Sequence, residues 1–237
     1  MKRILLPCGE TKELVYYLAA EEYVAQALGE GFFVWRTAPC VIFGRNQDME
    51  AEVNVPFCRE QGIAMWRRKS GGGCVYSDEG NLMISCVMPG TDVQSAFTFY
   101  LERLAAALRS LGVPAVTTSH NDIMVGGRKV SGNACFADKS SCIIHGTLMY
   151  DVNFSRLEKA ITPSEQKLSS HGVKSVRQRV SNLRELGLDC GMDRLEEHIA
   201  ASFSEGIEIL PSDASVRILE IERSYLDPEF IKRSNKI

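Results

Sequence analysis

Two long amphipathic helices are the strongest structural signal in the sequence. Apolar residues recur at helical spacing over Glu13–Leu28 and over Ala96–Leu111, and a glycine follows each segment directly. Shorter helices are predicted over Ser155–Ile161 and Asp193–Phe203, with Ser155 as the N-cap of the first in a capping box. The apolar segments between these helices are short, so the chain must combine helices with strands.

Short apolar segments bounded by turn residues predict the strands. The predicted strands are Phe32–Trp35, Cys40–Phe43, Ile63–Trp66, Leu82–Met88, Ile123–Val125, Lys129–Val130 and Ile143–Tyr150. Helices and strands mix without the regular alternation that builds a parallel sheet, and Gly126–Gly127 indicates a hairpin. The sequence therefore predicts an α+β fold, a mixed β-sheet flanked by helices, with residues 1–237 forming a single domain.

Charge and hydropathy exclude several classes of function. The chain has 27 basic and 30 acidic residues, a net charge of −3, without the basic surplus typical of nucleic-acid-binding proteins. Its longest apolar runs are much shorter than a membrane span, and its first residues do not form a signal peptide. We therefore expect a cytoplasmic protein that binds neither nucleic acid nor a membrane.

Eight scattered cysteines do not form a C-x-x-C pair, which opposes both a disulfide framework and a zinc site. They are Cys8, Cys40, Cys58, Cys74, Cys86, Cys135, Cys142 and Cys190. Most are expected to be small, reduced core residues.

The segment 67–73, Arg-Arg-Lys-Ser-Gly-Gly-Gly, lies between two predicted strands. Consecutive glycines allow the backbone to approach a ligand closely, and their N–H groups can line an anion. The three basic side chains beside them suit a phosphate or a carboxylate. A glycine-rich hairpin with a solvated charge run is the alternative. The segment is not a P-loop, because no Gly-Lys-Ser/Thr follows at the required spacing.

The segment 121–134, Asn-Asp-Ile-Met-Val-Gly-Gly-Arg-Lys-Val-Ser-Gly-Asn-Ala, presents Lys129 just after the predicted hairpin turn. A lysine there can clamp a phosphate or an acyl carbonyl that becomes negative during transfer. Ser131–Gly132 is expected to make the following chain flexible. The carboxylate of Asp122 could hold Mg²⁺, which prefers one or two carboxylates together with substrate phosphates. An ordinary polar hairpin is the alternative.

Residues 142–150 place a cysteine directly before a predicted strand and a histidine on that strand. A lone histidine such as His145 is more often a hydrogen-bonded structural residue than a catalyst. Cys142 lies thirteen residues after Lys129, and a thiolate close to a lysine has a lowered pKa. From the sequence alone, however, a buried, unreactive cysteine is the preferred interpretation of Cys142.

Residues 172–183 form a basic patch in an otherwise acidic protein. Its cations are Lys174, Arg177 and Arg179. A solvated charge run is the default interpretation. Together with the three earlier segments, it predicts a site for an anionic ligand such as a nucleotide or an acyl phosphate.

In this order, the segments resemble the lipoate–protein ligase family, relatives of biotin protein ligase, from about Glu13 to Leu183. The motifs that carry the resemblance are WRTAPCVIFGRNQD, RRKSGGGCVYSDEGN, NDIMVGGRKVSGNA, HGTLMYD and GVKSVRQRVSNL. The resemblance implies an α+β catalytic domain that activates lipoate with ATP and Mg²⁺ to lipoyl-AMP. The lipoyl group would then pass to one lysine of an acceptor lipoyl domain, in a 2-oxoacid dehydrogenase subunit or a glycine cleavage H protein.

The resemblance also implies roles for individual residues. Lys129 would contact the acyl carbonyl and the adenylate phosphate, while Asn121 and Asp122 would lie at the phosphate and the metal. The lipoyl group and adenylate would be bound by Arg68, Ser70, Gly71, Gly72, Gly73, Val75, Tyr76, His145, Gly146 and Thr147. A loop on the nucleotide side would contribute Lys174, Ser175, Arg177 and Arg179.

Three features depart from the ligase pattern. Tyr76-Ser77-Asp78 stands where ligases commonly have Phe-His-Asp, and Cys142 stands where they usually have glycine. The chain also ends near Ile237, where typical ligases continue, so we expect the C-terminal accessory domain to be absent or supplied as a separate protein.

Two alternative functions follow from these departures. The first is an octanoyl or lipoyl transferase that needs no ATP and uses Cys142 as its thioester nucleophile. The second is a non-catalytic lipoyl-binding paralogue. The sequence does not distinguish lipoate from octanoate, identify the acceptor protein or fix the oligomeric state.

Overall fold

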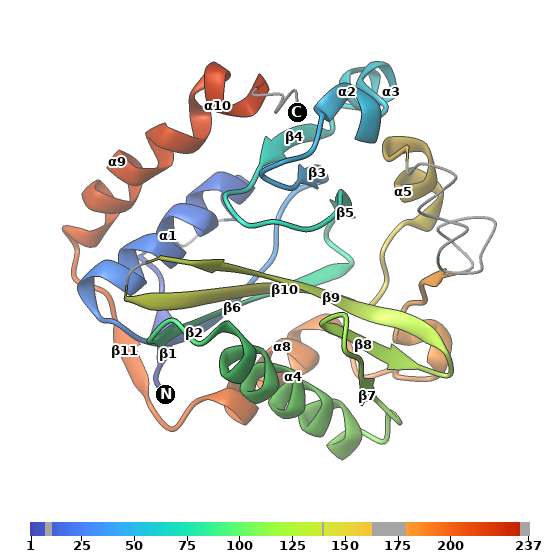
Figure 1. Cartoon of the computed structure of the whole chain (residues 1–237). Helices are drawn as coiled ribbons and strands as arrows, with labels where there is room; N and C mark the ends of the chain where they lie inside the picture. The colour runs from blue at the N-terminus through green and yellow to red at the C-terminus, as the bar shows by residue number, and fades with distance from the viewer. Residues whose placement is uncertain (8–10, 139, 163–178, 233–237) are drawn as a thin grey trace.

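Two β-sheets organise the part of the chain that this computed structural model describes, residues 1–7, 11–138, 140–162 and 179–232 (Figure 1). The strands are β1 (Arg3–Leu5), β2 (Gly31–Trp35), β3 (Cys40–Phe43), β4 (Ala64–Arg67), β5 (Val75–Ser77), β6 (Asn81–Pro89), β7 (Val116–Thr117), β8 (Asp122–Val125), β9 (Arg128–Ala137), β10 (Ser141–Met149) and β11 (Ile207–Ile209). Within those residues, the larger sheet has eight strands in the order β11-β1-β2-β6-β10-β9-β8-β7, and the smaller has three in the order β4-β3-β5. Both sheets contain parallel and antiparallel pairs.

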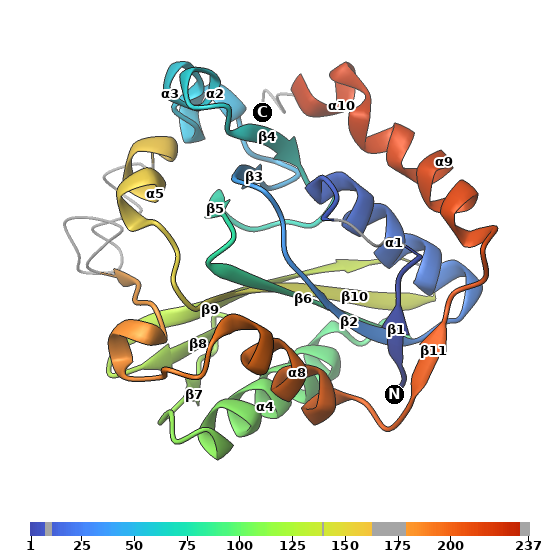
Figure 2. The same ribbon diagram turned by 180° about the vertical axis from the view of Figure 1, so that it is seen from behind.

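The described residues also form helices, which pack around both sheets. They are α1 (Leu14–Ala27), α2 (Met49–Glu52), α3 (Val55–Glu60), α4 (Val93–Ser110), α5 (Phe154–Ala160), α8 (Met192–Phe203), α9 (Ala214–Leu226) and α10 (Pro228–Lys232), with a 3-10 turn at Arg184–Leu186. Helices α4 and α8 lie on one side and α1 and α9 on the other, as Figures 1 and 2 show from opposite directions. The predicted α+β fold, a mixed sheet flanked by helices, is confirmed.

Side chains alternate between the two faces of the larger sheet, so the apolar residues of one strand belong to two different cores. In β6, Leu82 and Ile84 pack with α4 and α8, whereas Met83 packs with α1. In β2, Phe32 and Phe33 divide in the same way. Neighbouring side chains of a strand point to opposite faces, so strands covered on both faces are continuous apolar runs in the sequence. A separate core lies between the smaller sheet, α3 and α5.

The predicted glycine hairpin joins β8 and β9, where Gly126 and Gly127 have φ angles of 56° and 75°. Strand β9 is much longer than the predicted Lys129–Val130, because Ser131 and Gly132 continue the strand by pairing with Leu148 and Thr147 of β10. The expectation that Ser131–Gly132 makes the chain flexible was therefore wrong. Pairing on both sides, with β8 and β10, holds these two residues in the sheet.

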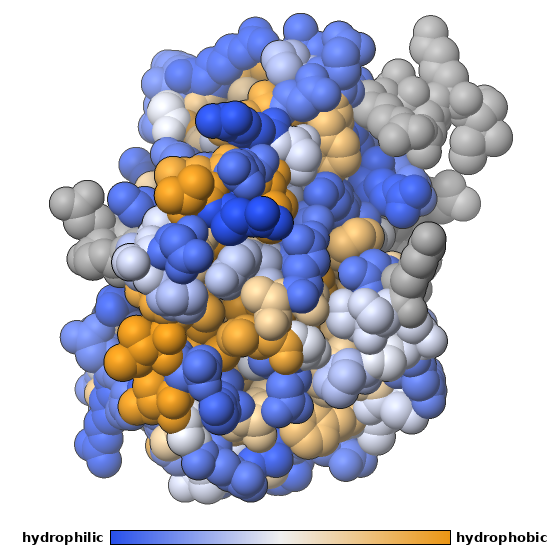
Figure 3. All heavy atoms as spheres, turned by 90° about the vertical axis from the view of Figure 1, so that its left-hand side faces the viewer, coloured by the Kyte–Doolittle hydropathy of each residue, from blue (hydrophilic) through white to orange (hydrophobic). Residues whose placement is uncertain are grey.

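The short elements β1 and β11, and the helices α9 and α10, have no counterpart among the predicted elements. Three-residue strands are too short to show a period, and α9 carries apolar residues on an exposed face as well as a buried one. Large hydrophobic side chains of β11 and α9 are exposed, including Ile207, Ile209, Val216 and Leu219. Figure 3 shows hydrophobic residues gathered on the side where these elements lie.

None of the helices in the described part of the chain combines the length and the apolar character that a membrane crossing requires.

Helix α5 begins with a different cap from the one predicted. Asn153 is the N-cap, and its side-chain oxygen accepts a hydrogen bond from the Arg156 backbone N–H at 3.0 Å. Ser155 already lies inside the helix, so the capping box predicted at Ser155 is wrong. Asparagine and serine cap equally well, and the segment offers both, so local preference does not choose between them.

Replacement of the observed cap should therefore cost more stability than replacement of the predicted one. We expect Asn153→Ala to lower the free energy of unfolding by about 1 kcal/mol, because one backbone N–H of the first turn loses its partner. The control Ser155→Ala, at an exposed helical position, should change it by less than about 0.5 kcal/mol. Urea unfolding followed by circular dichroism measures both, and a larger effect at Ser155 would contradict the assignment.

Candidate functional site

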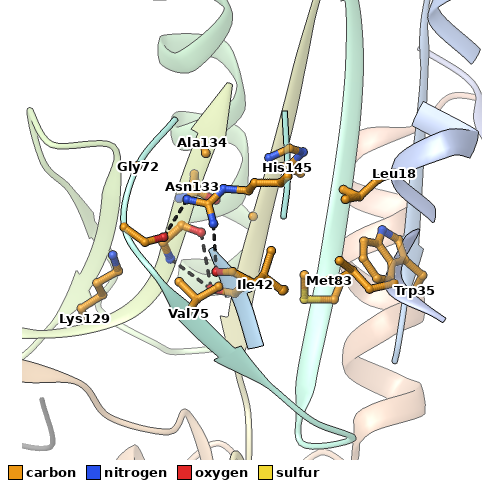
Figure 4. Close-up of a pocket in the computed structure, with 16 residues that line it drawn as sticks. Leu18, Trp35, Ile42, Gly72, Val75, Met83, Lys129, Asn133, Ala134 and His145 are labelled. Atoms are coloured by element: carbon orange, nitrogen blue, oxygen red, sulfur yellow. Dashed lines mark hydrogen bonds between the residues drawn. The ribbon is translucent and has the colours of Figure 1, made fainter. Parts of the chain in front are cut away.

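A pocket lies where α1, the larger sheet and the smaller sheet meet (Figure 4). Its lining residues are Leu14, Leu18, Trp35, Ile42, Arg68, Gly72, Gly73, Val75, Met83, Lys129, Gly132, Asn133, Ala134, His145, Gly146 and Thr147. In Figure 4 the side chains of Leu18, Trp35 and Met83 lie at one end, and Lys129 lies at the other. The pocket is therefore apolar at one end and cationic at the other.

At the cationic end, Lys129 is held by a carboxylate that also binds an arginine. The Lys129 Nζ lies 2.7 Å from Oδ1 of Asp122, and an Arg179 guanidinium nitrogen donates to Oδ2 of Asp122 at 3.3 Å. Asp122 is buried, whereas the side chains of Lys129 and Arg179 are 19% and 26% exposed. The two cations thus share one buried carboxylate and keep part of their surface open.

A glycine makes room for the lysine side chain. A β-carbon placed on Gly132 would lie 2.5 Å from the Lys129 Nζ, which is closer than atoms can approach. The backbone at 179–181 runs beside the same strand, because Val180 forms a bridge with Lys129 and the Ser181 N–H donates to the Lys129 carbonyl at 3.0 Å. The structure therefore brings Arg179 to Lys129, while the other residues predicted for that loop, Lys174, Ser175 and Arg177, lie outside the described residues.

The basic side chains of segment 67–73 are occupied by protein groups. Arg67 donates to the carbonyls of Gly44, Arg45 and Gln47 at 2.7–3.1 Å and to the Ile231 carbonyl at 3.1 Å. Of the three basic residues, only Arg68 lines the pocket, and whether they bind an anion stays a prediction. The two arginines donate hydrogen bonds to carbonyl oxygens of the protein, and Lys69 forms an ion pair with a carboxylate.

Arg68 holds the segment 68–73, which we call the glycine loop, in place. Its guanidinium donates to the carbonyls of Ile42, Gly71 and Gly73 at 2.7–3.2 Å. Burial lowers the pKa of Arg68 to about 10, so the group remains protonated at neutral pH. Lys69 pairs with Glu22 of α1 at 2.7 Å.

A hydrogen-bonded chain of five side chains runs along one wall of the pocket. Trp35 Nε1 donates to Ser85 Oγ at 2.8 Å, and Ser85 donates to Oε1 of Glu21 at 2.6 Å. The other Glu21 oxygen lies 2.9 Å from His145 Nδ1, and His145 Nε2 lies 2.6 Å from Ser70 Oγ. Tryptophan can only donate, so the direction of the first two bonds is fixed. Glu21 therefore accepts from both sides and orients His145 toward Ser70.

Three members of this chain were not predicted as site residues: Glu21, Ser85 and Trp35. A signal for two of them is present in the sequence. Glu21 stands in a helix whose neighbouring residues are largely apolar, and Ser85 interrupts the apolar run of β6. Buried polar groups need partners, so a glutamate and a serine in such positions indicate a hydrogen-bonded site. Their pairing with each other and with His145 could only come from the tertiary structure.

Several predicted site residues do not line the pocket. Ser70 and Gly71 both belong to the glycine loop without lining the cavity, and the buried Ser70 side chain contacts His145. Asn121 does not line it, and its carbonyl accepts a hydrogen bond from Asn133, which does. Asp122 contributes through Lys129 and does not line the pocket itself.

Tyr76 points away from the pocket, contrary to expectation, and so does Cys142, which agrees with the preferred interpretation of a buried, unreactive cysteine. In β5 the alternation of side chains directs Val75 into the pocket and Tyr76 into the core with α5. In β10 it directs His145 toward the pocket and Cys142 into the core under α4, with 1% of its surface exposed. Burial raises the pKa of the Cys142 thiol, whereas a nucleophilic cysteine needs a lowered one. The structure does not support Cys142 as a nucleophile.

Comparison with known proteins identifies the family. The family model described as the lipoyl protein ligase A/B catalytic domain matches residues 14–204. Lipoate-protein ligase LplJ of Bacillus subtilis is 40% identical over 172 residues, which cover 71% of this chain and 52% of the relative. Lipoate–protein ligase 1 of Staphylococcus aureus is 41% identical over 173 residues, covering 71% and 52%. The chain spans about half the length of these curated relatives.

Solved structures share the fold over nearly the whole chain. An archaeal bi-partite lipoate protein ligase from Thermoplasma acidophilum, described with its E2 lipoyl domain, superimposes with a TM-score of 0.84 at 24% identity, covering 100% of this chain and 99% of that one. A lipoate-protein ligase A bound with ATP superimposes with a TM-score of 0.81 at 25% identity, covering 98% of each chain. The family match, the relatives and the shared architecture agree with one another, and the chain belongs to the lipoyl protein ligase A/B catalytic-domain family.

Proposed function

We propose that the chain is a lipoate–protein ligase, which activates lipoate with MgATP to lipoyl-AMP and transfers the lipoyl group to a lysine of an acceptor lipoyl domain. The observation that carries the proposal is the pocket, apolar at one end and bounded by Lys129 at the other. Family membership, relatives named as lipoate–protein ligases and a structural neighbour bound with ATP support it.

The apolar end suits the dithiolane ring and acyl chain of lipoate. Leu18, Ile42, Val75 and Met83 are aliphatic or thioether side chains, and Trp35 offers a flat aromatic surface. Such walls gain free energy by removing an apolar chain from water, and sulfur makes favourable contacts with aromatic rings. A carboxylate at the far end of the same chain would then lie near Lys129.

Both chemical steps develop negative charge at the cationic end. In the first, a lipoate carboxylate oxygen attacks the α-phosphorus of ATP, and pyrophosphate leaves. In the second, the acceptor amine attacks the lipoyl carbonyl, the carbon–oxygen bond to phosphate breaks, and AMP leaves. Lys129 can stabilise the charge on the phosphate and on the carbonyl oxygen, and Arg179 adds a second cation close by.

Magnesium belongs to the nucleotide substrate in this proposal. The described residues contain no group of three side chains that could hold a metal ion. Nucleotide oxygens would therefore provide most of its ligands, and Asp122 could contribute a carboxylate oxygen once Lys129 and Arg179 turn to the phosphates. The acceptor is a lipoyl domain of the 2-oxoacid dehydrogenase or glycine cleavage type.

Lys129→Ala should lower kcat/KM for lipoylation by at least about 100-fold, because the developing charge loses its positioned cation. The measurements are AMP release and the mass of an acceptor lipoyl domain incubated with lipoate and MgATP. The matched control is Arg128→Ala, which removes the neighbouring cation outside the pocket and should retain near-normal activity. Unchanged circular dichroism would show that both variants fold. Near-normal lipoylation by Lys129→Ala would refute the assigned role.

Cys142→Ala should retain ATP-dependent lipoylation, because the thiol is buried on the far side of β10 from the pocket. In the native protein at pH 8, iodoacetamide should modify the partly exposed Cys190 well before Cys142. Peptide mass mapping before and after denaturation measures the order of labelling. Loss of all acyl transfer in a Cys142→Ala variant that still folds would support the thioester transferase instead.

A further inference from the structure

The two C-terminal helices α9 and α10, which we call the C-terminal helical pair, lie outside the residues that the family model matches, 14–204. They are nevertheless part of the core that lines the pocket. Ile218 and Tyr225 of α9 belong to the same buried cluster as Leu18 and Trp35. In Figures 1 and 2, α9 lies along α1, which forms one wall of the pocket. This proximity raises the question of what the pair does for the site.

The first link to the glycine loop is a cluster of three side chains. The Lys69 Nζ contacts both oxygens of Glu22, at 2.7 and 3.0 Å, and lies 4.5 Å from the ring centre of Tyr225. The Tyr225 hydroxyl donates to the same Glu22 oxygen that Lys69 contacts more closely. Tyr225 is 3% exposed, so its hydroxyl and ring are fixed by packing. Helix α9 therefore holds both the carboxylate and the ammonium group of this ion pair.

The second link is a backbone contact. The Arg67 Nε donates to the Ile231 carbonyl of α10, while another nitrogen of the same guanidinium binds the carbonyls at 44, 45 and 47. Arg67 is 1% exposed and is thus committed to these partners. The helical pair consequently contacts the chain at residues 67 and 69, immediately before the turn of the glycine loop.

The link continues into the pocket through the next residue. Ser70 follows Lys69 directly, and its hydroxyl contacts His145, which Glu21 orients. Glu21 and Glu22 are neighbours on α1, yet one faces the pocket and the other faces α9. A displacement of Glu22 or Lys69 would therefore be transmitted to Ser70, His145 and the glycine loop by direct contacts.

We propose that the C-terminal helical pair positions the glycine loop, and that Tyr225 is the positioning residue that couples the pair to the substrate pocket. For the identity of the ligand, lipoate, this inference rests on the proposed function. Because coupling is reciprocal, a ligand that orders the glycine loop must also stabilise α9.

The first test needs no ligand. Tyr225→Phe removes the hydroxyl and keeps the ring, and it should speed amide hydrogen exchange in the glycine loop. The matched control is Tyr150→Phe, which removes another buried tyrosine hydroxyl, one that accepts from the Gly191 N–H at 2.9 Å on the α8 side of the molecule. Tyr150→Phe should leave exchange in the glycine loop unchanged. Equal loop exchange in wild type and Tyr225→Phe would overturn the proposal.

The second test measures lipoate binding through the fluorescence of Trp35, which lines the pocket. Tyr225→Phe and Glu22→Gln should each raise the Kd for lipoate by about 3- to 10-fold, which corresponds to the loss of one hydrogen bond of ordinary strength. The KM for lipoate should rise in parallel with little change in kcat, and bound lipoate should slow amide exchange in α9 of the wild type. A merely structural role would lower Tm and leave these quantities unchanged.

The outcomes separate the two proposals. A wild-type protein that neither binds nor transfers lipoate would refute the proposed function, and exchange in the glycine loop would still decide the role of Tyr225. A wild type that binds lipoate, with both variants binding equally well, would overturn the positioning role alone.

Discussion

The pocket depends on the buried guanidinium of Arg68. It joins the smaller sheet, through the Ile42 carbonyl, to the glycine loop, through the carbonyls of Gly71 and Gly73. A cation in a poorly solvated interior is stable only when its donors are satisfied, so these carbonyls must remain where they are. Arginine suits the task because its planar group donates in several directions at once and stays charged. The loop therefore takes a defined shape before any ligand arrives.

Helix α1 connects the glycine loop to the rest of the site through two adjacent glutamates. Successive positions on a helix are about 100° apart, so Glu21 and Glu22 reach different neighbours from one rigid element. Glu21 is shared by Ser85 and His145, and Glu22 is shared by Lys69 and Tyr225. Both are largely withdrawn from water, which makes each contact costly to break. Helix α1 thus fixes both the hydrogen-bonded wall of the pocket and the C-terminal helical pair.

The sequence predicted the fold class, because long amphipathic helices and doubly buried strands leave clear patterns. It also indicated the segments that meet at the pocket, but not the direction of individual side chains. The sequence did contain the information needed to predict the direction of some of these side chains. Residues 142 and 145 are separated by an odd number on one strand, so Cys142 and His145 must face opposite sides. The partners of Arg67 and Lys69, and the Ile42 partner of Arg68, could not be foreseen because they lie far away in the sequence. Solvated cations and buried cations have the same sequence signature.

Under the proposed function, the arrangement at Lys129 would allow one site to bind a phosphate and later release it. Asp122 already satisfies Lys129 and Arg179, so the cations are held close together without a ligand, and their mutual repulsion is offset. An arriving phosphate would replace Asp122 as the partner of the two cations, so no ion pair would have to form from fully solvated groups. Two cations against one carboxylate still leave an excess of positive charge that attracts the anion. In the proposed reaction, Asp122 would be in place to recover both partners when AMP departs, and this would limit the free energy that product release requires.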